Sequence, residues 1–144
     1  MAERILVIDD EPRICRSLRA YFAARGCEVD CASGLKEAKE RLRTAVYAVV
    51  ITDLSLDGAR GTEGLEIAAF VRAQGCGTQV ILLTGYGSPE TEAEARRRGV
   101  VAIFAKPQPL AELARVVAEL NRNTARPSAP LFEKLGGTTD LALL

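Results

Sequence analysis

The chain has 144 residues, of which 48% are hydrophobic, and 19 Lys and Arg residues balance 19 Asp and Glu residues. This length suits one globular domain, and the balanced charge gives no basic footprint for nucleic acid. No apolar run approaches the ~20 residues that span a bilayer, and the N-terminus lacks a signal-peptide pattern. We therefore expect a cytoplasmic protein that contacts neither nucleic acid nor membrane directly.

The absence of histidine and the spacing of the cysteines exclude several kinds of catalytic and metal site. The sequence contains no histidine, which excludes Ser-His and Cys-His nucleophiles, histidine-ligated metals and a phosphohistidine role. The cysteines agree with a reducing compartment and lack the paired short spacings of a structural zinc site. We interpret all four as small buried hydrophobes, with the second and third on one face of a strand. They are Cys15, Cys27, Cys31 and Cys76.

Five short apolar runs alternate with stretches of helical periodicity. The runs at 4–8, 47–53 and 79–85 are apolar on consecutive residues, which is typical of parallel strands covered on both faces. The run at 27–31 alternates and favours an edge strand. With a fifth strand at 100–106, the strands are followed by helices at 12–24, 34–44, 63–74, 89–98 and 109–121. This alternation predicts a doubly wound α/β fold.

The periodic pattern ends near residue 121. We therefore predict one domain over residues 1–121 and a linker-like tail over 122–144, which begins in the polar, proline-containing stretch NRNTARPSAP. Two interpretations of the tail stay open. It is either a mobile terminus or a short docking segment for a partner or for a second copy of the chain.

Polar side chains stand at the ends of four predicted strands. Asp9 and Asp10 follow the first strand, Asp53 ends the third, Thr84 lies at the end of the fourth and Lys106 at the end of the fifth. In a doubly wound sheet, ligands bind outside the carboxyl ends of the strands, so we expect these residues to meet.

This set of residues favours phosphoryl chemistry with a metal ion. Crowded carboxylates repel unless a cation is present, and oxygen ligands without histidine suit Mg²⁺. A lysine can neutralise a phosphoryl oxygen, a threonine hydroxyl can donate to one, and an aspartate can accept a phosphoryl group.

Four motifs carry a resemblance to a known family. They are VIDDEP, VVITDLSL, ILLTGYGSPET and FAKP, and through them the chain resembles, over residues 4 to about 121, the receiver domain of bacterial two-component response regulators. The resemblance implies a flavodoxin-like fold of five parallel strands in the order 2-1-3-4-5. It also implies a stand-alone signalling switch that receives its phosphoryl group from a sensor histidine kinase or a histidine phosphotransfer protein and controls a downstream protein.

The resemblance also implies a role for each matching position. Asp53 would accept the phosphoryl group. Asp10 and Asp53 would bind Mg²⁺ directly, Asp9 would assist, and Ser55 would contribute its backbone carbonyl. Thr84 and Lys106 would bind phosphoryl oxygens, Ser55 and Tyr86 would tune the lifetime of the phosphate, and the Lys106–Pro107 peptide bond would be cis.

Two departures from the family pattern stand out. The loop at 54–63 is enlarged, with Asp57 where proline is common, and both Asp57 and Glu63 add charge to a segment that we interpret as a solvated turn. Ile103 occupies the usual position of a switch aromatic, while Phe104 is expected to face the other side of the strand. We therefore expect the signal to pass through the 84–88 loop and the helix after it.

Two other functions remain open at this stage. A degenerate receiver would act as a binding scaffold without chemistry. A Mg²⁺-dependent phosphatase of the haloacid-dehalogenase type would also use an aspartate nucleophile, but after the first strand in a D-x-D pattern, where this chain has DDEPR. Whether the chain pairs with itself also stays open.

Overall fold

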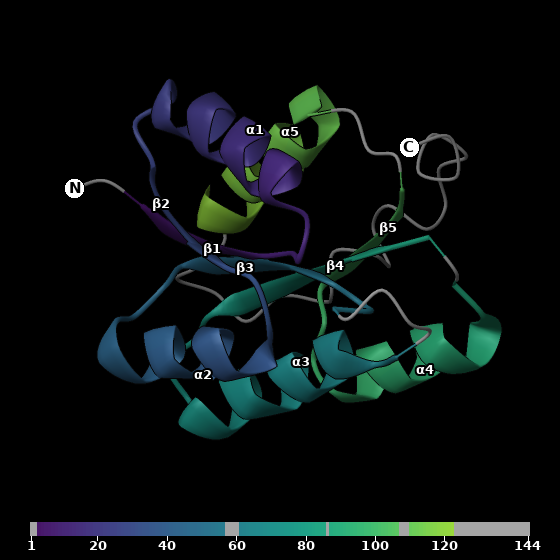
Figure 1. Cartoon of the computed structure of the whole chain (residues 1–144). Coiled ribbons are helices and arrows are strands. Elements are labelled where there is room, and N and C mark those ends of the chain that lie inside the picture. The colour runs from purple at the N-terminus through teal and green to yellow at the C-terminus, as the bar shows by residue number, and fades with distance from the viewer. Residues whose placement is uncertain (1–2, 57–60, 86, 107–109, 123–144) are drawn as a thin grey trace.

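The predicted strands form one parallel sheet between two layers of helices (Figure 1). The computed structural model describes residues 3–56, 61–85, 87–106 and 110–122. The sheet order is β2-β1-β3-β4-β5, which confirms both the predicted order and the edge position of the second strand. The strands are β1 (Arg4–Ile8), β2 (Glu28–Ala32), β3 (Val49–Asp53), β4 (Gln79–Thr84) and β5 (Ala102–Ala105).

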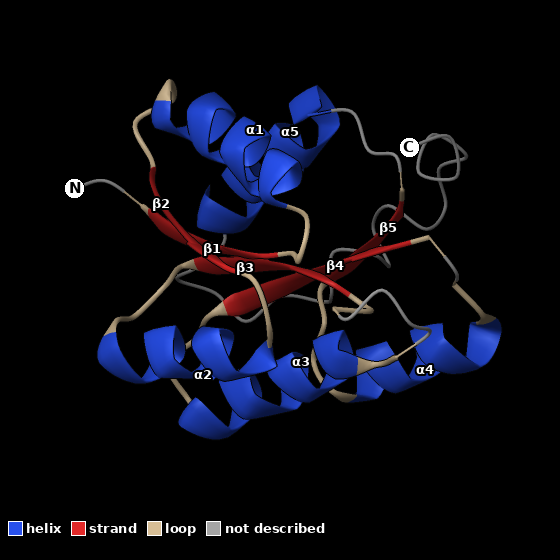
Figure 2. Cartoon of the chain, in the orientation of Figure 1, coloured by secondary structure: helices blue, strands red, loops and turns tan. Residues whose placement is uncertain are grey.

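Helices cover both faces of the sheet (Figure 2). One layer holds α1 (Pro12–Ala23) and α5 (Leu110–Arg122), and the other layer holds α2 (Leu35–Thr44), α3 (Glu63–Gln74) and α4 (Pro89–Arg97). Local sequence sets several boundaries. For example, the Ser88 hydroxyl accepts a hydrogen bond from the Thr91 N–H at 3.1 Å and caps α4, and Gly75 ends α3 in the left-handed region with φ of 67°.

The central strands are buried on both faces, as their continuous apolar runs predict. Ile5 and Val7 pack into the core under α1 and α5, whereas Leu6 and Ile8 pack into the core under α2, α3 and α4. This alternation follows from the two-residue period of a strand. It anchors the carboxyl ends of β1, β3 and β4 in rigid surroundings.

The interpretation of all four cysteines as buried hydrophobes is wrong. Cys15 and Cys31 form a disulfide, with their Cα atoms 6.2 Å apart, and Cys76 is exposed. The inward faces of α1 and β2 bring the sulfur atoms of Cys15 and Cys31 together although 16 positions separate these residues in sequence. Cys27 and Cys31 do share a face, because both pack against the core under α1 and α5.

Residues 123–144 lie outside the described part of the chain, so the predicted division at residue 121 and both interpretations of the tail remain predictions. Within the described residues, no helix has the length and apolar character needed to cross a bilayer.

Candidate functional site

The polar residues predicted at the strand ends lie at one edge of the sheet. Backbone hydrogen bonds continue the sheet up to these residues and fix their positions. The Asp9 N–H donates to the Ala32 carbonyl at 3.0 Å, and the Lys106 N–H donates to the Thr84 carbonyl at 2.9 Å. Asp53 ends β3 in register with Leu83 on β4. The carboxyl end of each strand is therefore held to a neighbour where the polar side chain begins.

Lys106 joins two of the predicted acids. Its Nζ donates to Asp53 Oδ2 at 2.8 Å and to Asp9 Oδ2 at 3.2 Å. Both acids are largely shielded from solvent, since their side chains are 13% and 2% exposed, respectively. Burial lowers the pKa of the Lys106 ammonium, but the hydrogen bond to Asp53 and the charges of both acids outweigh burial and raise that pKa overall.

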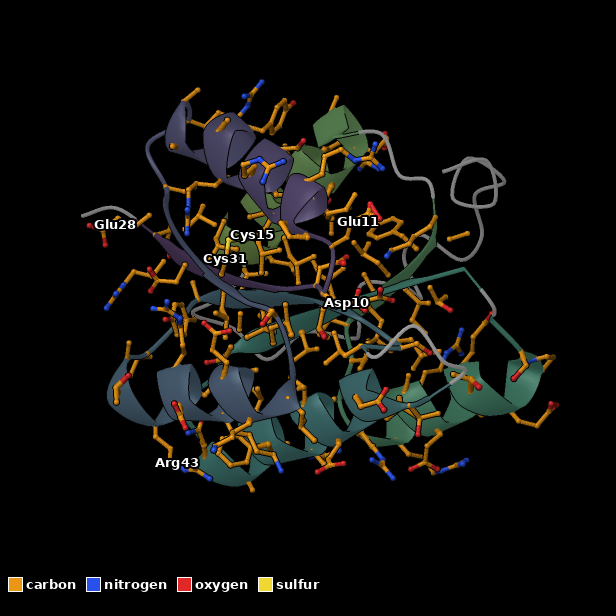
Figure 3. The ribbon with its side chains drawn as sticks, in the orientation of Figure 1. Asp10, Glu11, Cys15, Glu28, Cys31 and Arg43 are labelled. Atoms are coloured by element: carbon orange, nitrogen blue, oxygen red, sulfur yellow. A yellow bond between two sulfur atoms is a disulfide. The ribbon has the colours of Figure 1, made fainter. Side chains whose placement is uncertain are left out.

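The third acid completes a group that could hold a metal ion. Carboxylate oxygens of Asp9, Asp10 and Asp53 all lie within 4.8 Å of one another. Asp10 is exposed on the loop between β1 and α1, as Figure 3 shows. All three candidate ligands are carboxylate oxygens. Asp9 is buried, Asp53 is half-buried and Asp10 is open to solvent, so the Mg²⁺ implied by the resemblance fits this site.

Main-chain N–H groups orient Asp9 and Asp53. The Glu11 N–H donates to Asp9 Oδ1 at 2.9 Å, and the Ser55 N–H donates to Asp53 Oδ1 at 3.3 Å. Each carboxylate thus uses one oxygen for the backbone and the other for Lys106. Both side chains are held in one orientation toward the site.

Gly64 packs against the backbone at the end of β3, a role that the sequence analysis did not assign. Its N–H donates to the Leu54 carbonyl at 2.9 Å. A Cβ at this position would lie 2.6 Å from the Asp53 carbonyl oxygen and 2.9 Å from the Leu54 Cα atom. Only glycine allows α3 to approach the end of β3 this closely. The sequence signal for this role was a glycine in the first turn of a predicted helix.

The enlarged 54–63 loop is held by its own polar groups. Ser55 Oγ donates to the Gly61 carbonyl at 2.7 Å, and the Leu56 N–H donates to Glu63 Oε1 at 3.2 Å. The Glu63 carboxylate therefore acts within the loop and is not one of the three grouped acids. Asp57 lies outside the described residues.

Thr84 and Ile103 are the residues expected to take part in the switch that the structure describes. Thr84 is buried at the end of β4, with 6% of its surface exposed. Ile103 packs against the core under α2, α3 and α4, while Phe104 is buried in the opposite core, which confirms that the two side chains face opposite sides of β5. Tyr86 and Pro107 lie outside the described residues, so their roles remain predictions, as does that of the Ser55 carbonyl.

Comparison with known families identifies the class of protein. The model of the response regulator receiver domain matches residues 5–118, which is well over half of the chain. The chain therefore belongs to the response regulator receiver domain family, and phosphorylation-based two-component signalling is the function of its class.

Curated relatives are longer than this chain. It is 30% identical to the response regulator protein PilR of Pseudomonas aeruginosa, over 94% of this chain and 30% of that protein. It is 34% identical to the regulatory protein AtoC of Escherichia coli, over 79% of this chain and 24% of that protein. The chain thus spans less than a third of the length of either relative.

Solved structures agree on the fold. The receiver domain of the Francisella response regulator 1452 matches with a TM-score of 0.74 and 27% identity, over 85% of this chain and 98% of that one. The beryllofluoride-activated NtrC4 receiver domain dimer matches with a TM-score of 0.75 and 26% identity, over 84% of this chain and 98% of that one. A CheY-like receiver domain from Methanospirillum hungatei, at 22% identity, shares the fold with a TM-score of 0.80, over 87% of this chain and 98% of that one.

Proposed function

We propose that the chain is a phosphoacceptor switch in which Asp53 receives a phosphoryl group from a histidine of a partner kinase or phosphotransfer protein in the cytoplasm. The observation that carries this proposal is the contact of Lys106 with both Asp9 and Asp53, within a group of three carboxylates. Lys106 contacts two of these three acids, which leaves negative charge uncompensated, so the site is suited to bind a cation and a phosphoryl group.

In the transfer step, Asp53 Oδ attacks the phosphorus atom, the new P–O bond forms and the P–N bond to the donor imidazole breaks. Lys106 then pairs with a phosphoryl oxygen, and the Thr84 hydroxyl donates to another. Asp9, Asp10, Asp53 and the Ser55 carbonyl would hold Mg²⁺, which supplies positive charge that offsets the charge of the transferred group.

The output is a change of surface around β4, α4, β5 and α5 that controls a protein partner. Because Ile103 replaces the usual aromatic, the movement passes through the 84–88 loop into α4, whose first turn Ser88 caps. Structures with and without a bound phosphoryl mimic test this route. If the 84–88 loop occupied the same position in both, the route would be wrong.

The family membership favours this function over a haloacid-dehalogenase phosphatase. The filled chemical positions favour it over a scaffold without chemistry. A phosphatase would turn over a chromogenic phosphate ester many times, whereas a phosphoacceptor takes up one phosphoryl group per chain.

Intact-mass spectrometry after incubation with acetyl phosphate tests the proposal. We expect one added phosphoryl group that depends on Mg²⁺ and is abolished by Asp53→Asn, because the resemblance assigns Asp53 as the acceptor and, of the two acids that contact Lys106, Asp53 is the more exposed. Asp30→Asn is the matched control, since it alters an acid on a neighbouring strand outside the site, and it should be labelled normally.

Two results would contradict the assignment. One is labelling of the Asp53→Asn variant at a second position. The other is the absence of both an added phosphoryl group and any binding of beryllofluoride, a phosphoryl mimic that does not hydrolyse, in the unaltered protein.

A further inference from the structure

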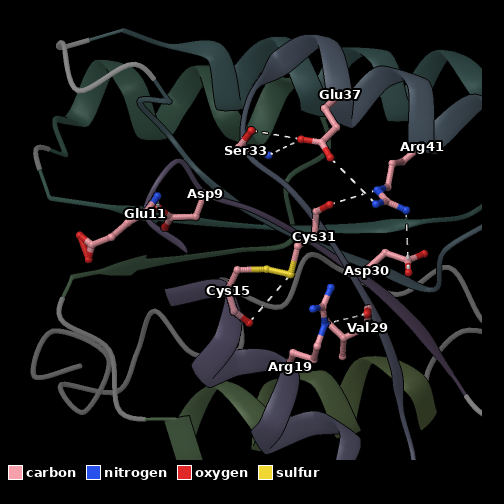
Figure 4. Close-up of a disulfide and its surroundings, with 10 residues drawn as sticks. All are labelled: Asp9, Glu11, Cys15, Arg19, Val29, Asp30, Cys31, Ser33, Glu37 and Arg41. Atoms are coloured by element: carbon pink, nitrogen blue, oxygen red, sulfur yellow. Dashed lines mark hydrogen bonds and ion pairs between the residues drawn. A yellow bond between two sulfur atoms is a disulfide. The ribbon is translucent and has the colours of Figure 1, made fainter. Parts of the chain in front are cut away.

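The Cys15–Cys31 disulfide lies beside the loop that carries Asp9 and Asp10. Figure 4 shows the bond between the first turn of α1 and the carboxyl end of β2, with Asp9 and Glu11 nearby. Cys31 pairs with Val7 in the sheet register, and the Asp9 N–H donates to the carbonyl of the next β2 residue, Ala32, at 3.0 Å. The acidic loop is therefore attached to β2 directly by the hydrogen bond at Asp9 and, through the first turn of α1, by the disulfide at Cys15.

The start of α1 lacks two features that commonly stabilise a helix N-terminus. Its N-cap residue, Glu11, makes no side-chain capping hydrogen bond, and the first turn carries no acidic side chain. Pro12 at the first helical position favours the start of α1, and Ile14 packs against the core. The covalent bond from Cys15 to β2 adds a fixed attachment for this turn, and through it for the Asp10 loop.

The two bonded cysteines differ in burial. Cys15 is 7% exposed and belongs to the core. Cys31 is half-buried on β2, an edge strand of the sheet. Arg19 lies one helical turn after Cys15, and its Nε donates to the Val29 carbonyl at 3.4 Å on the same strand. The thiolate is the reactive form of a cysteine in oxidation and in thiol–disulfide exchange.

We propose that Cys15 and Cys31 are a reversible oxidation site and that the disulfide tightens Mg²⁺ binding at Asp9, Asp10 and Asp53. The oxidised structure already brings the three carboxylates within 4.8 Å of one another. Reduction releases α1 from β2 and loosens the Asp10 loop, so binding of the ion then has to order that loop. The effect on metal binding rests on the proposed function, whereas the oxidation site does not.

A hydroperoxide is an oxidant that can form this disulfide from the two thiols. The Cys31 thiolate attacks one peroxide oxygen, the S–O bond forms and the O–O bond breaks, and the leaving oxygen takes up a proton. The Cys15 sulfur then attacks the Cys31 sulfenic sulfur, the S–S bond forms, and the thiol proton leaves with the hydroxyl group as water. Two electrons pass from the sulfurs to the peroxide. A dithiol reverses the reaction by exchange at Cys31 and is itself converted to a disulfide.

The experiment compares the full chain after treatment with hydrogen peroxide and with dithiothreitol, each removed before measurement. Alkylation followed by peptide mass mapping identifies which thiols are bonded, and calorimetric titration measures Mg²⁺ affinity. We expect peroxide to link Cys15 to Cys31 and to tighten Mg²⁺ binding about fivefold, within the usual range of coupling between two sites.

Matched variants test whether the response to oxidation comes from Cys15 and Cys31. Cys31→Ser and Cys15→Ser should each abolish the redox dependence of Mg²⁺ affinity, and circular dichroism confirms that they fold. The partly exposed Cys31 site is the safer of the two for folding. The Cys27→Ser/Cys76→Ser double variant should retain the full response, because it removes only the cysteines outside the disulfide.

The outcomes separate the two proposals. Peroxide treatment that leaves Cys15 and Cys31 unlinked overturns the oxidation site, and linkage with equal Mg²⁺ affinity in both states overturns its coupling to the metal. Linkage without Mg²⁺ binding in either state overturns the proposed function and the coupling that rests on it, while the oxidation site itself stands.

Discussion

Two regions place carboxylates beside the sheet: the acidic site, formed by Asp9, Asp10, Asp53 and Lys106, and the cluster around Asp30. The negative charges in the two regions are neutralised in different ways. The Asp30 carboxylate accepts a hydrogen bond from the Tyr47 hydroxyl at 2.6 Å and contacts Arg4 at 3.3 Å and Arg41 at 4.0 Å. In the acidic site, Asp9 and Asp53 share the ammonium of Lys106, with Asp10 close by.

This difference distinguishes a structural role from a binding role. Asp30 has its charge matched by groups of the same chain, so it stabilises the fold without any ligand. The acidic site has more carboxylates than cations, and it therefore favours an added cation. Removing a carboxylate charge should consequently have opposite effects on stability in the two regions, and only the acidic site should respond to Mg²⁺.

The largest effect is expected from Gly64→Ala. The new Cβ would overlap the backbone at the end of β3, so we expect a loss of about 2–3 kcal/mol in the free energy of unfolding, measured by urea denaturation, with weaker Mg²⁺ binding. Gly34→Ala at the start of α2 is the matched control, because a Cβ there meets nothing within 4 Å. Equal losses in both variants would show that the close approach at Gly64 is unimportant.

The next effect is expected from Lys106→Met, which keeps a long apolar side chain but removes the charge. The partly buried acids then lose their common partner, and we expect a loss of about 2 kcal/mol without metal and a smaller loss with Mg²⁺. Because the fold raises the pKa of Lys106 above its usual 10.5, the stability from this contact is present below pH 10.5 and is lost as pH rises through the raised pKa. The two proteins should therefore converge in alkaline denaturation experiments.

A smaller pair of opposite effects contrasts the two regions directly. Asp10→Asn removes one of three neighbouring negative charges, so without metal we expect a gain of about 0.5–1 kcal/mol and the loss of stabilisation by Mg²⁺. Asp30→Asn removes a charge that arginines match and should cost about 1 kcal/mol with or without Mg²⁺. Thermal unfolding at several Mg²⁺ concentrations measures both, and the same sign for the two variants would contradict the comparison.

The smallest effect concerns Tyr47. Burial first, and then its hydrogen bond to Asp30, raise the pKa of Tyr47 to about 12. The unfolded chain has a tyrosine pKa of about 10, so this contribution to stability is complete below pH 10 and is lost between pH 10 and 12. Tyr47→Phe should cost about 0.5–1 kcal/mol at neutral pH and flatten the alkaline part of the curve of stability against pH. An unchanged alkaline slope would exclude Tyr47 as its source.

Much of the acidic site follows from periodicity alone. Consecutive apolar residues mark β1, β3 and β4 as buried parallel strands, and parallel strands bring their carboxyl ends to one edge. The amino-acid sequence was therefore sufficient to group Asp9, Asp53 and Lys106. The alternating run at 27–31 likewise placed β2 at the edge, because an edge strand is only partly covered.

The disulfide and the glycine contact were not accessible in the same way. Pairing of Cys15 with Cys31 depends on the distance and direction between α1 and β2, and no spacing rule in a chain with four cysteines selects that pair. The need for glycine at position 64 arises from the approach of α3 to β3. The Asp30 cluster joins residues from two strands, a helix and a loop, so its balance of charge also had no sequence signal.

The order of elements, the layers and the residue types at the strand ends could all be predicted from the amino-acid pattern, because they depend on short-range periodicity and on the geometry common to parallel sheets. Tertiary packing was needed to show which carboxylates share Lys106, which cysteines bond and where a Cβ cannot fit. Those features depend on distances of a few ångströms between elements far apart in the chain, and side-chain packing sets such distances.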